Sequence, residues 1–241
     1  MRPIISVCLA SYNGEKFIRQ QLSSILSQLG ENDELIISDD SSKDRTISLI
    51  SDLNDRRIKL ISHQSFKNPI YNFENALRHA NGEFIFLSDQ DDLWVEGKVQ
   101  FILNDLKRFD LVVTDCQIID NNDKLLHESF YVINNSKKGF LNNLWSNSYL
   151  GCCMAFRKEV LRLALPFPKK IPMHDWWLGL VGELFYKTHF SKKRLVLYRR
   201  HDQNASSTSE KSTNSFVIKL SFRFRLLWEL LRLYWSRKYS C

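Results

Sequence analysis

Short apolar runs alternate with helix-like periodicity over about the first 115 residues, and this alternation limits the possible folds more than any other feature. Short apolar runs are typical of buried strands, whereas apolar residues spaced three or four apart are typical of helices packed on one face. The runs predict strands at residues 4–9, 35–37, 58–61, 84–87 and 111–113. The periodic segments predict helices at residues 15–29, 46–53, 72–80 and 99–106. Such alternation favours a parallel sheet with helices on both faces and right-handed crossovers.

The second half of the chain has a weaker pattern. Residues 121–138 are polar and predict loops. Further strands are predicted at residues 151–156 and 194–199, and further helices at residues 158–165 and 174–186. Gly30 is expected to end the first helix, because glycine readily takes the left-handed conformation found there.

Polar clusters follow three of the predicted strands. Ser11, Tyr12 and Asn13 follow the first strand, residues 39–42 follow the second, and residues 89–92 follow the fourth. Ligands of parallel α/β sheets bind at the carboxyl ends of the strands. We therefore expect these clusters to meet at one edge of the sheet and to form a ligand site there.

The third cluster is the most informative, because a buried strand ends in Asp89, Asp91 and Asp92. Three crowded carboxylates repel one another, and a divalent cation would relieve the repulsion. Oxygen ligands suit Mg²⁺ or Mn²⁺. Neighbouring side chains of an extended segment point apart, so one carboxylate can bind metal while another hydrogen-bonds a ligand hydroxyl. The alternative is a solvated acidic turn, but the apolar strand and Trp94 on either side favour a site.

Composition limits the class of protein. The chain has 241 residues, of which 44% are hydrophobic and 12% aromatic, so it can bury a sizeable core and is not globally disordered. Its net charge of +7 suggests an anionic partner: nucleic acid, a phosphorylated substrate or a membrane surface. The five cysteines have no C-x-x-C spacing and are expected to be buried, reduced thiols. We expect neither a secretory leader nor a membrane span.

The C-terminal tail, residues 216–239, predicts a basic amphipathic helix. Large apolar side chains share one face: Leu220, Phe224, Leu227, Trp228, Leu231, Tyr234 and Trp235. The basic side chains share the other: Lys219, Arg223, Arg225, Arg232 and Arg237. Such a helix suits an anionic membrane surface, although docking on the domain or pairing in a dimer would also explain it. Residues 205–215 are polar and predict a linker between a domain at 1–204 and a tail at 216–241.

Together the motifs resemble those of family 2 glycosyltransferases of the GT-A fold, and are most similar to bacterial enzymes that build rhamnose-containing surface polysaccharides such as O-antigen. The matching segments span roughly residues 4–204 and are residues 6–14, 38–46, 89–94, 174–177 and 198–201. The resemblance implies a Rossmann-like α/β fold whose mostly parallel sheet is flanked by helices. The C-terminal amphipathic helix would be added to that fold.

The resemblance also implies a nucleoside-diphosphate sugar as donor. Its nucleotide-sugar site would be formed by Ser11, Tyr12, Asn13, Asp39, Asp89 and Arg199. Asp39 would accept a hydrogen bond from the imide N–H of uracil or thymine, which predicts a UDP- or dTDP-sugar. The resemblance to rhamnose-transferring enzymes favours dTDP-rhamnose of the two. The alternative for Asp39 is an Asx turn or a helix cap, although Asp40 and Ser42 are better capping candidates.

The remaining site residues follow from the same resemblance. Asp91 and His201 would be the metal ligands, with Asp92 as the alternative direct ligand or as a supporting residue. A lone histidine is more often structural, which is the alternative for His201. Asp175 would be the catalytic base that takes the proton of the acceptor hydroxyl during an inverting displacement. Because Asp175 begins a helix, the helix dipole is expected to lower its pKa. The acceptor would lie against Gly151, Trp176 and Trp177. The alternatives are that Asp175 only caps its helix and that one tryptophan belongs to the core.

These observations predict a metal-dependent, inverting glycosyltransferase that acts on a lipid-linked glycan. It would be peripheral, at the cytoplasmic face of the bacterial inner membrane. One alternative is an inactive nucleotide-sugar-binding scaffold. A nucleic-acid binder is disfavoured, because the basic residues concentrate in the tail rather than along an aromatic groove. A nicotinamide dehydrogenase is disfavoured because no G-x-G-x-x-G follows the first strand.

Overall fold

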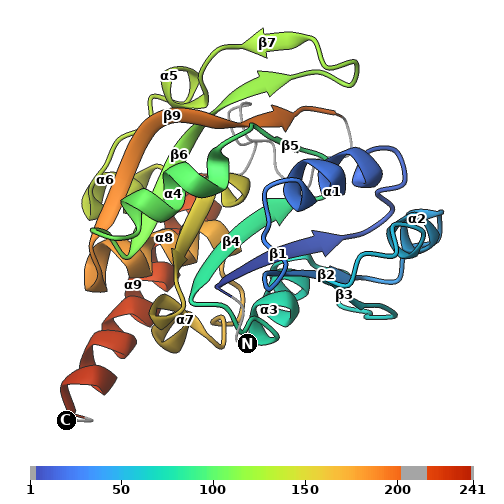
Figure 1. Cartoon of the computed structure of the whole chain (residues 1–241). Coiled ribbons are helices and arrows are strands. Elements are labelled where there is room, and N and C mark those ends of the chain that lie inside the picture. The colour runs from blue at the N-terminus through green and yellow to red at the C-terminus, as the bar shows by residue number, and fades with distance from the viewer. Residues whose placement is uncertain (1–3, 202–215, 240–241) are drawn as a thin grey trace.

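The computed structural model describes residues 4–201 and 216–239. One twisted sheet runs through the molecule, with helices on both of its faces (Figure 1). The described strands follow the order β3-β2-β1-β4-β8-β6-β9-β5, and β7 pairs with β6. Their bounds are β1 Ile5–Ser11, β2 Glu34–Asp39, β3 Ile58–Ile61, β4 Phe84–Asp89, β5 Leu93–Trp94, β6 Leu111–Ile119, β7 Leu125–His127, β8 Met154–Arg157 and β9 Thr188–Arg199.

The sheet is mostly parallel, as predicted, but it is not uniform. Strands β3, β2, β1 and β4 are parallel neighbours. Strand β8 then runs antiparallel to both β4 and β6, so it separates β6 from the parallel block. Beyond it, β6 and β9 pair in parallel. The predicted loop region at residues 121–138 contains β7 and a short helix, α5, as well as loops.

The helices are distributed over both faces of the sheet. Their bounds are α1 Ile18–Leu26, α2 Thr46–Ser51, α3 Pro69–Arg78, α4 Lys98–Asp105, α5 Phe130–Ile133, α6 Phe140–Trp145, α7 Glu159–Ala164, α8 His174–Phe185 and α9 Phe216–Tyr239. A short 3₁₀ turn, η1, covers Gly151–Cys153. The prediction for Gly30 was wrong, because α1 already ends at Leu26. The Gly30 amide instead donates to the Asp33 carboxylate at 2.8 Å.

Two hydrophobic cores lie on opposite faces of the sheet. Helices α1, α2 and α4 cover one core, and α3, α7, α8 and α9 cover the other. Neighbouring residues of β1 alternate between them, because successive side chains of a strand point to opposite faces: Val7 and Leu9 join the first core and Cys8 joins the second. The two cores fix the sheet rigidly and leave its carboxyl edge to carry loops.

Helix α9 confirms the predicted helical tail, and it packs on the domain. Leu226 and Leu230 are buried in the second core, with Leu233 packed beside them. The predicted apolar face is a different one and stays exposed, with Phe224 and Trp228 each 64% exposed. The predicted linker lies outside the described residues. No described helix is long and apolar enough to cross a bilayer.

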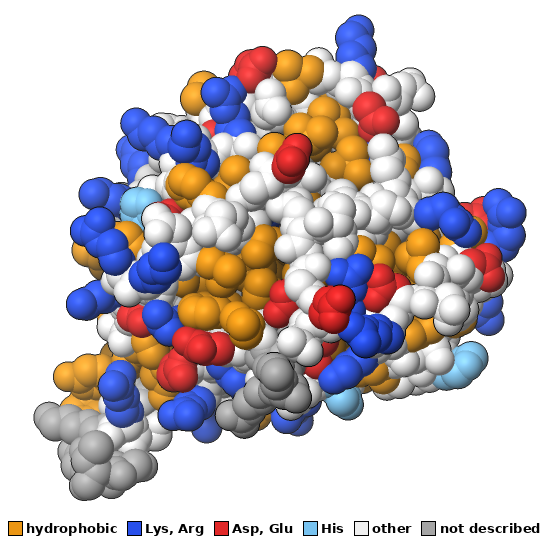
Figure 2. Space-filling model, viewed as in Figure 1, with side chains coloured by type: hydrophobic (Ala, Val, Ile, Leu, Met, Phe, Trp, Pro, Cys, Tyr) orange, Lys and Arg blue, Asp and Glu red, His pale blue; other side chains and the backbone are white. Residues whose placement is uncertain are grey.

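The basic side chains are dispersed over the face of the molecule that Figure 2 shows. Figure 2 shows Lys and Arg side chains around the edges of one face, with hydrophobic and acidic side chains between them. They do not form a continuous stripe on that face. The basic residues are therefore not confined to the tail, and on this face they do not form the clustered track that binds a phosphate backbone.

Candidate active site

A cavity of about 660 Å³ opens at the carboxyl ends of β1, β2 and β4. The three polar clusters noted in the sequence therefore do meet at one edge of the sheet. The lining side chains come from both halves of the chain and include Ser11, Tyr12, Asp40, Lys43, Lys67, Asn72, Phe73, Asp89, Asp91, Gly151, His174, Asp175 and Tyr198. We call residues 11–14, 39–46 and 65–69 the first wall, and residues 89–92, 151–153 and 173–175 the second wall.

Hydrogen bonds within the protein hold the first wall together. Asp39 is fully buried and lies behind the cavity surface. Its Oδ2 accepts from Ser11 Oγ at 2.7 Å and from Ser42 Oγ at 2.6 Å, and its Oδ1 accepts from the Ser42 amide at 2.8 Å. This is the turn geometry that the alternative interpretation of Asp39 described. Asn13 also lies off the cavity, and its Oδ1 accepts from the Lys43 amide at 2.8 Å. Tyr12, which lines the cavity, is 54% exposed.

Sequence reasoning missed the third part of the first wall, the loop after β3. Asp40 Oδ1 accepts from the Phe66 amide at 2.6 Å, which draws this loop to the cavity. The loop brings Lys67 and Asn68 to the lining, opposite Lys43 of the loop after β2. The signal for it was available, because β3 was predicted and parallel strands present their carboxyl ends at a shared edge.

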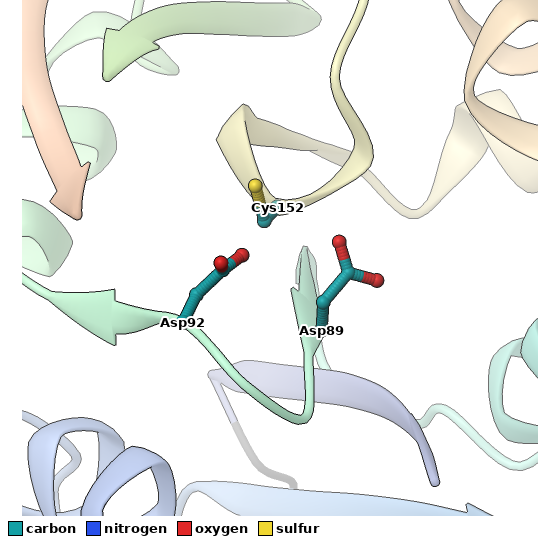
Figure 3. Close-up of side chains that lie close together, drawn as sticks. All are labelled: Asp89, Asp92 and Cys152. Carbon is teal, nitrogen blue, oxygen red and sulfur yellow. The ribbon is translucent and has the colours of Figure 1, made fainter. Parts of the chain in front are cut away.

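The second wall contains carboxylates with few partners. Figure 3 shows Asp89 and Asp92 turned toward the Cys152 thiol, and one ligand atom from each lies within 4.8 Å of the others. Asp92 is fully buried, and its Oδ1 accepts from the Arg199 amide at 2.9 Å. Its Oδ2 accepts no hydrogen bond of ordinary geometry from the described residues. This cluster is a possible acidic metal site.

Burial and mutual repulsion disfavour the charged forms in this cluster. Burial, followed by the nearby charges of Asp91 and Asp175, raises the pKa of Asp89 to about 8. Burial and the charges of Asp91 and Asp89 raise the pKa of Asp92 well above its usual range, although the Arg199 amide and the Cys152 thiol oppose the shift. A cation beside these groups would stabilise their ionised forms.

Asp91 and His201 are brought together as the sequence predicted. His201 Nε2 lies 2.6 Å from Asp91 Oδ2, and the His201 ring stacks on Phe17 of the loop before α1. Asp91 lines the cavity. The two side chains bond each other directly, and the cluster of possible metal ligands formed by Asp89, Asp92 and Cys152 contains neither of them.

The Arg199 side chain does not lie where it could contact the phosphates of a donor in the cavity. Its side chain is buried and does not line the cavity. Its Nε donates to the Asp91 carbonyl oxygen at 2.9 Å, and its guanidinium lies 4.4 Å from the centre of the Phe17 ring. Arg199 therefore clamps β9 against the acidic turn. Among the described residues, Lys43 and Lys67 are the lysine and arginine side chains that line the cavity.

Asp175 lines the cavity at the start of α8, and it is only 7% exposed. Its Oδ1 accepts from the Trp176 amide at 2.6 Å. Burial raises the pKa of Asp175 to about 7, although backbone hydrogen bonds oppose the shift. The prediction that the helix start would lower this pKa was wrong, because the loss of solvent outweighs the stabilisation by the backbone amides.

The two tryptophans do not reach the cavity. Trp177 is 1% exposed, and its Nε1 donates to the Ala164 carbonyl oxygen at 3.0 Å within the second core. The expectation that Trp177 contacts the acceptor is therefore not met, since no ligand can reach a ring inside the core. Trp176 is partly buried against α6, where its Nε1 donates to the Asn143 carbonyl oxygen at 2.7 Å. Gly151 does line the cavity beside Asp175.

Comparison with known proteins agrees with this geometry. Residues 6–163 match the model of the family described as "Glycosyl transferase family 2". The matched segment contains β1, β2 and β4, at whose carboxyl ends the cavity opens. The chain belongs to this family.

Two relatives of this family 2 glycosyltransferase act in bacteria. It is 28% identical over 186 residues to the Escherichia coli UDP-Glc:alpha-D-GlcNAc-diphosphoundecaprenol beta-1,3-glucosyltransferase WfgD, covering 73% of this chain and 68% of the relative. It is 25% identical over 220 residues to the dTDP-rhamnosyl transferase RfbG of Shigella flexneri, covering 81% of this chain and 72% of the relative. The predicted relationship to enzymes of bacterial surface polysaccharides, rhamnosyltransferases among them, is thereby confirmed.

A solved structure confirms the predicted GT-A fold. S. aureus TarS 1–349 in complex with UDP-GlcNAc superimposes with a TM-score of 0.72 and 18% identity. The match covers 94% of this glycosyltransferase and 66% of the TarS fragment, which is slightly less than two thirds. The long α9 is the additional C-terminal helix that the sequence predicted.

Three more lining residues of this glycosyltransferase had no role in the sequence interpretation. Asn72 and Phe73 of α3 border the cavity, and Asn72 donates to the Ser11 carbonyl oxygen at 3.1 Å. His174 lies beside Asp175. Residues on α3 appeared to be part of an ordinary amphipathic helix, because periodicity does not show which turn of a helix reaches a sheet edge.

Proposed function

We propose that this glycosyltransferase moves a sugar from a UDP- or dTDP-linked donor to a lipid-linked glycan in surface polysaccharide synthesis, with inversion at the sugar carbon. The single observation that carries the proposal is that Asp175 and Asp91, whose carboxylate pairs with His201, both line one cavity at the carboxyl edge of the sheet. A base and a metal-binding carboxylate facing a shared space are what one in-line displacement needs. The names of WfgD and RfbG support UDP and dTDP donors, and that of WfgD an acceptor carried on diphosphoundecaprenol.

Asp175 is the catalytic base of the proposal. An acceptor hydroxyl is a weak nucleophile until its proton is removed during attack. A carboxylate with a pKa of about 7 is a much stronger base than an ordinary aspartate and is still substantially ionised at neutral pH. The proton passes to Asp175 while the hydroxyl oxygen attacks the sugar carbon from the face opposite the leaving nucleoside diphosphate.

Asp91 and His201 would hold a divalent metal ion, with Asp89 nearby on the ribose side. A bound Mg²⁺ or Mn²⁺ would offset the charge that develops on the leaving diphosphate. Lys43 and Lys67 border the same cavity and add positive charge near the phosphates. Lys43 and Lys67 would therefore have the phosphate-binding role that the sequence analysis assigned to Arg199.

The first wall binds the nucleoside in this proposal. Ser11, Tyr12 and Asn13 belong to the loop after β1, and the exposed Tyr12 ring offers a flat surface to the base or ribose. Asp39 Oδ1 accepts one described hydrogen bond, from the Ser42 amide, and a carboxylate oxygen can accept two. The imide N–H of uracil or thymine would supply the second once the Ser11 and Ser42 loops move aside, because Asp39 lies behind the cavity surface.

We also propose that α9 and α6 form a surface that meets an anionic membrane, as a peripheral protein requires. Leu141 and Trp145 of α6 are 77% and 60% exposed. Arg223 of α9 lies 5.0 Å from the centre of the Trp145 ring and donates to its carbonyl oxygen. The exposed apolar side chains of both helices are thus next to arginines, a composition that favours anionic lipid headgroups.

A donor screen tests the proposed function. The full-length chain is incubated with Mn²⁺, with UDP-glucose, dTDP-rhamnose or GDP-mannose, and with a short-chain analogue of GlcNAc-diphosphoundecaprenol. We expect mass spectrometry to show transfer from a UDP- or dTDP-sugar and not from GDP-mannose. Transfer from none of them, together with no slow donor hydrolysis, would refute the enzymatic reading and favour a scaffold.

Liposome sedimentation tests the membrane surface. Truncation before α9 is a poor test, because it would remove Leu226 and Leu230 from the second core. Trp228→Glu changes only the exposed face of α9 and is expected to reduce sedimentation with phosphatidylglycerol liposomes several-fold. Val132→Glu on the exposed side of α5 is the matched control, since Val132 is 77% exposed away from α9. Equal sedimentation of all three proteins would contradict the proposal.

A further inference from the structure

His174 is an unusual residue in the second wall. It is the first residue of α8, lines the cavity and is 5% exposed. Neither Nδ1 nor Nε2 has a hydrogen-bond partner among the described residues. Nearly all buried polar groups in proteins are hydrogen-bonded, because an unmade bond destabilises the fold. Two unmade bonds on one ring at the wall of a cavity therefore point to a ligand.

Packing defines what this ring can recognise. It stacks on Phe73 of α3, with the ring centres 4.0 Å apart and the planes 24° apart. Burial lowers the pKa of His174 to about 3, so the ring is neutral at physiological pH. A neutral imidazole has one nitrogen that donates and one that accepts. A hydroxyl group also donates and accepts, so it suits this ring better than a phosphate or a carboxylate does.

Gly151 leaves space for the His174 ring, because glycine has no side chain. A Cβ at position 151 would lie 3.1 Å from His174 Nε2, which is closer than ordinary van der Waals contact, and 3.8 Å from Asp175 Cβ. Nε2 therefore faces the η1 turn that forms the cavity wall beside Asp175. Both ring nitrogens are covered by protein atoms, so a bond to a ligand in the cavity requires a rotation about the Cβ–Cγ bond or a shift of η1.

We propose that His174 is a sugar-positioning residue, whose ring hydrogen-bonds a hydroxyl group of the sugar that lies beside Asp175. This inference rests on the proposed function and deepens it. The hydroxyl group belongs to the donor sugar or to the acceptor sugar, and the two sources give different results below.

The test uses His174→Phe in the full-length chain. Phenylalanine keeps a flat ring against Phe73 and removes both unsatisfied nitrogens. We expect the melting temperature to rise by roughly 2–4 °C. We expect kcat/KM for transfer to fall by roughly 10-fold to 100-fold, because the sugar hydroxyl loses its partner in a desolvated site. His174→Gln, which offers both a donor and an acceptor, should recover part of the transfer.

Calorimetry identifies the source of the hydroxyl group. The titrants are UDP and UDP-glucose, dTDP and dTDP-rhamnose, and the short-chain GlcNAc-diphosphoundecaprenol analogue. If the donor sugar is the partner, His174→Phe weakens nucleotide-sugar binding roughly 10-fold and leaves nucleoside-diphosphate binding unchanged. If the acceptor is the partner, only binding of the acceptor analogue weakens.

His189→Phe is the matched control. The His189 ring also stacks on a phenylalanine, Phe109, with the centres 4.5 Å apart, but it lies 3.9 Å from the Asp105 carboxylate and outside the cavity lining. This variant should neither gain stability nor change any titration. A His174→Phe protein that is less stable than the wild type, or that binds all titrants as the wild type does, overturns the proposal. Absence of transfer by the wild type would refute the proposed function alone, since the titrations do not need turnover.

Discussion

The two walls of the cavity differ in how completely their buried polar groups are hydrogen-bonded. In the first wall the buried Asp39 accepts three hydrogen bonds from Ser11 and Ser42. In the second wall Asp92 Oδ2 and both nitrogens of His174 have no partner among the described residues. Burial also raises the pKa of Asp175 to about 7 and that of Asp89 to about 8.

In the proposed function this difference would correspond to a surface that binds the nucleoside and a surface at which transfer occurs. A hydrogen-bonded wall is rigid and can hold a nucleoside in a fixed place before reaction. A wall of poorly satisfied groups is less stable in itself, and gains most when a cation, a sugar hydroxyl or a proton arrives. The comparison predicts that substitutions in the second wall affect the rate of transfer, whereas substitutions in the first wall affect nucleotide affinity and folding.

The largest expected effect is that of Asp175→Asn. Asparagine keeps the shape of the side chain but cannot take the proton, so transfer should fall by roughly 10²-fold to 10⁴-fold. Initial rates with saturating donor and acceptor measure this loss. Asp52→Asn, an exposed substitution after α2, should keep full activity. An Asp175→Asn enzyme with more than a tenth of wild-type activity would remove Asp175 from the chemistry.

Asp91→Asn should have the next largest effect. Removing a metal-ligating carboxylate typically costs about 3 kcal/mol of transition-state stabilisation or more, which is roughly a 100-fold loss. Titration of Mn²⁺ against activity should show a weaker apparent metal affinity in this variant than in the wild type. Asp123→Asn, at the partly exposed carboxylate that pairs with Arg199, is the control. Full turnover of the wild type in excess chelator would contradict the metal role.

Below neutral pH, the rate of sugar transfer should fall about tenfold for each unit by which the pH decreases. The base form of Asp175 is the ionised one, and its pKa in the folded protein is about 7 rather than 3.8. Single-turnover rates should therefore rise from pH 5 to about pH 7 and then level off. The same raised pKa means that the folded state binds more protons than the unfolded state between pH 3.8 and pH 7, so this group's stability contribution is lost as pH rises through that range. A flat rate profile between pH 5 and pH 7 would show that Asp175 is ionised throughout.

Asp39→Asn should have the smallest effect on turnover. It should nevertheless lower both the stability of the protein and its affinity for UDP. The amide nitrogen would face a hydrogen-bond donor of Ser11 or Ser42, so the free energy of unfolding should fall by about 1–3 kcal/mol. Affinity for UDP should fall roughly 10-fold, because the base-binding loops lose their anchor. Thermal denaturation and calorimetry measure the two changes. Unchanged stability with unchanged UDP affinity would mean that the first wall does not depend on Asp39.

The parallel half of the fold was predictable because its signals are local. Strands β1, β2 and β4 are nearly continuous apolar runs, and each is followed by polar residues at the same edge. The insertion of β8 between β4 and β6 was not predictable, since strand direction depends on how the chain returns from distant loops. The helix preceding Gly30 was found, but its end was misplaced by several residues.

The residue types of the site were easier to predict than their surroundings. Asp91 and His201 do meet, as the family motifs implied. Trp177 was misassigned because α8 is apolar on nearly all sides, so its sequence does not show which face is in the core. The pKa of Asp175 was predicted in the wrong direction, because burial in the folded protein is a tertiary effect that a helix start does not reveal.

The most direct test of the central claim measures two quantities on the same preparations of Asp175→Asn and Asp39→Asn: UDP affinity by calorimetry and transfer in a single turnover at saturating donor. The account predicts that the effects separate. Asp175→Asn keeps wild-type UDP affinity and loses transfer by roughly 10²-fold or more, whereas Asp39→Asn loses affinity and transfers at close to the wild-type rate once saturated. Loss of UDP affinity in Asp175→Asn, with transfer restored at saturating donor, would contradict it.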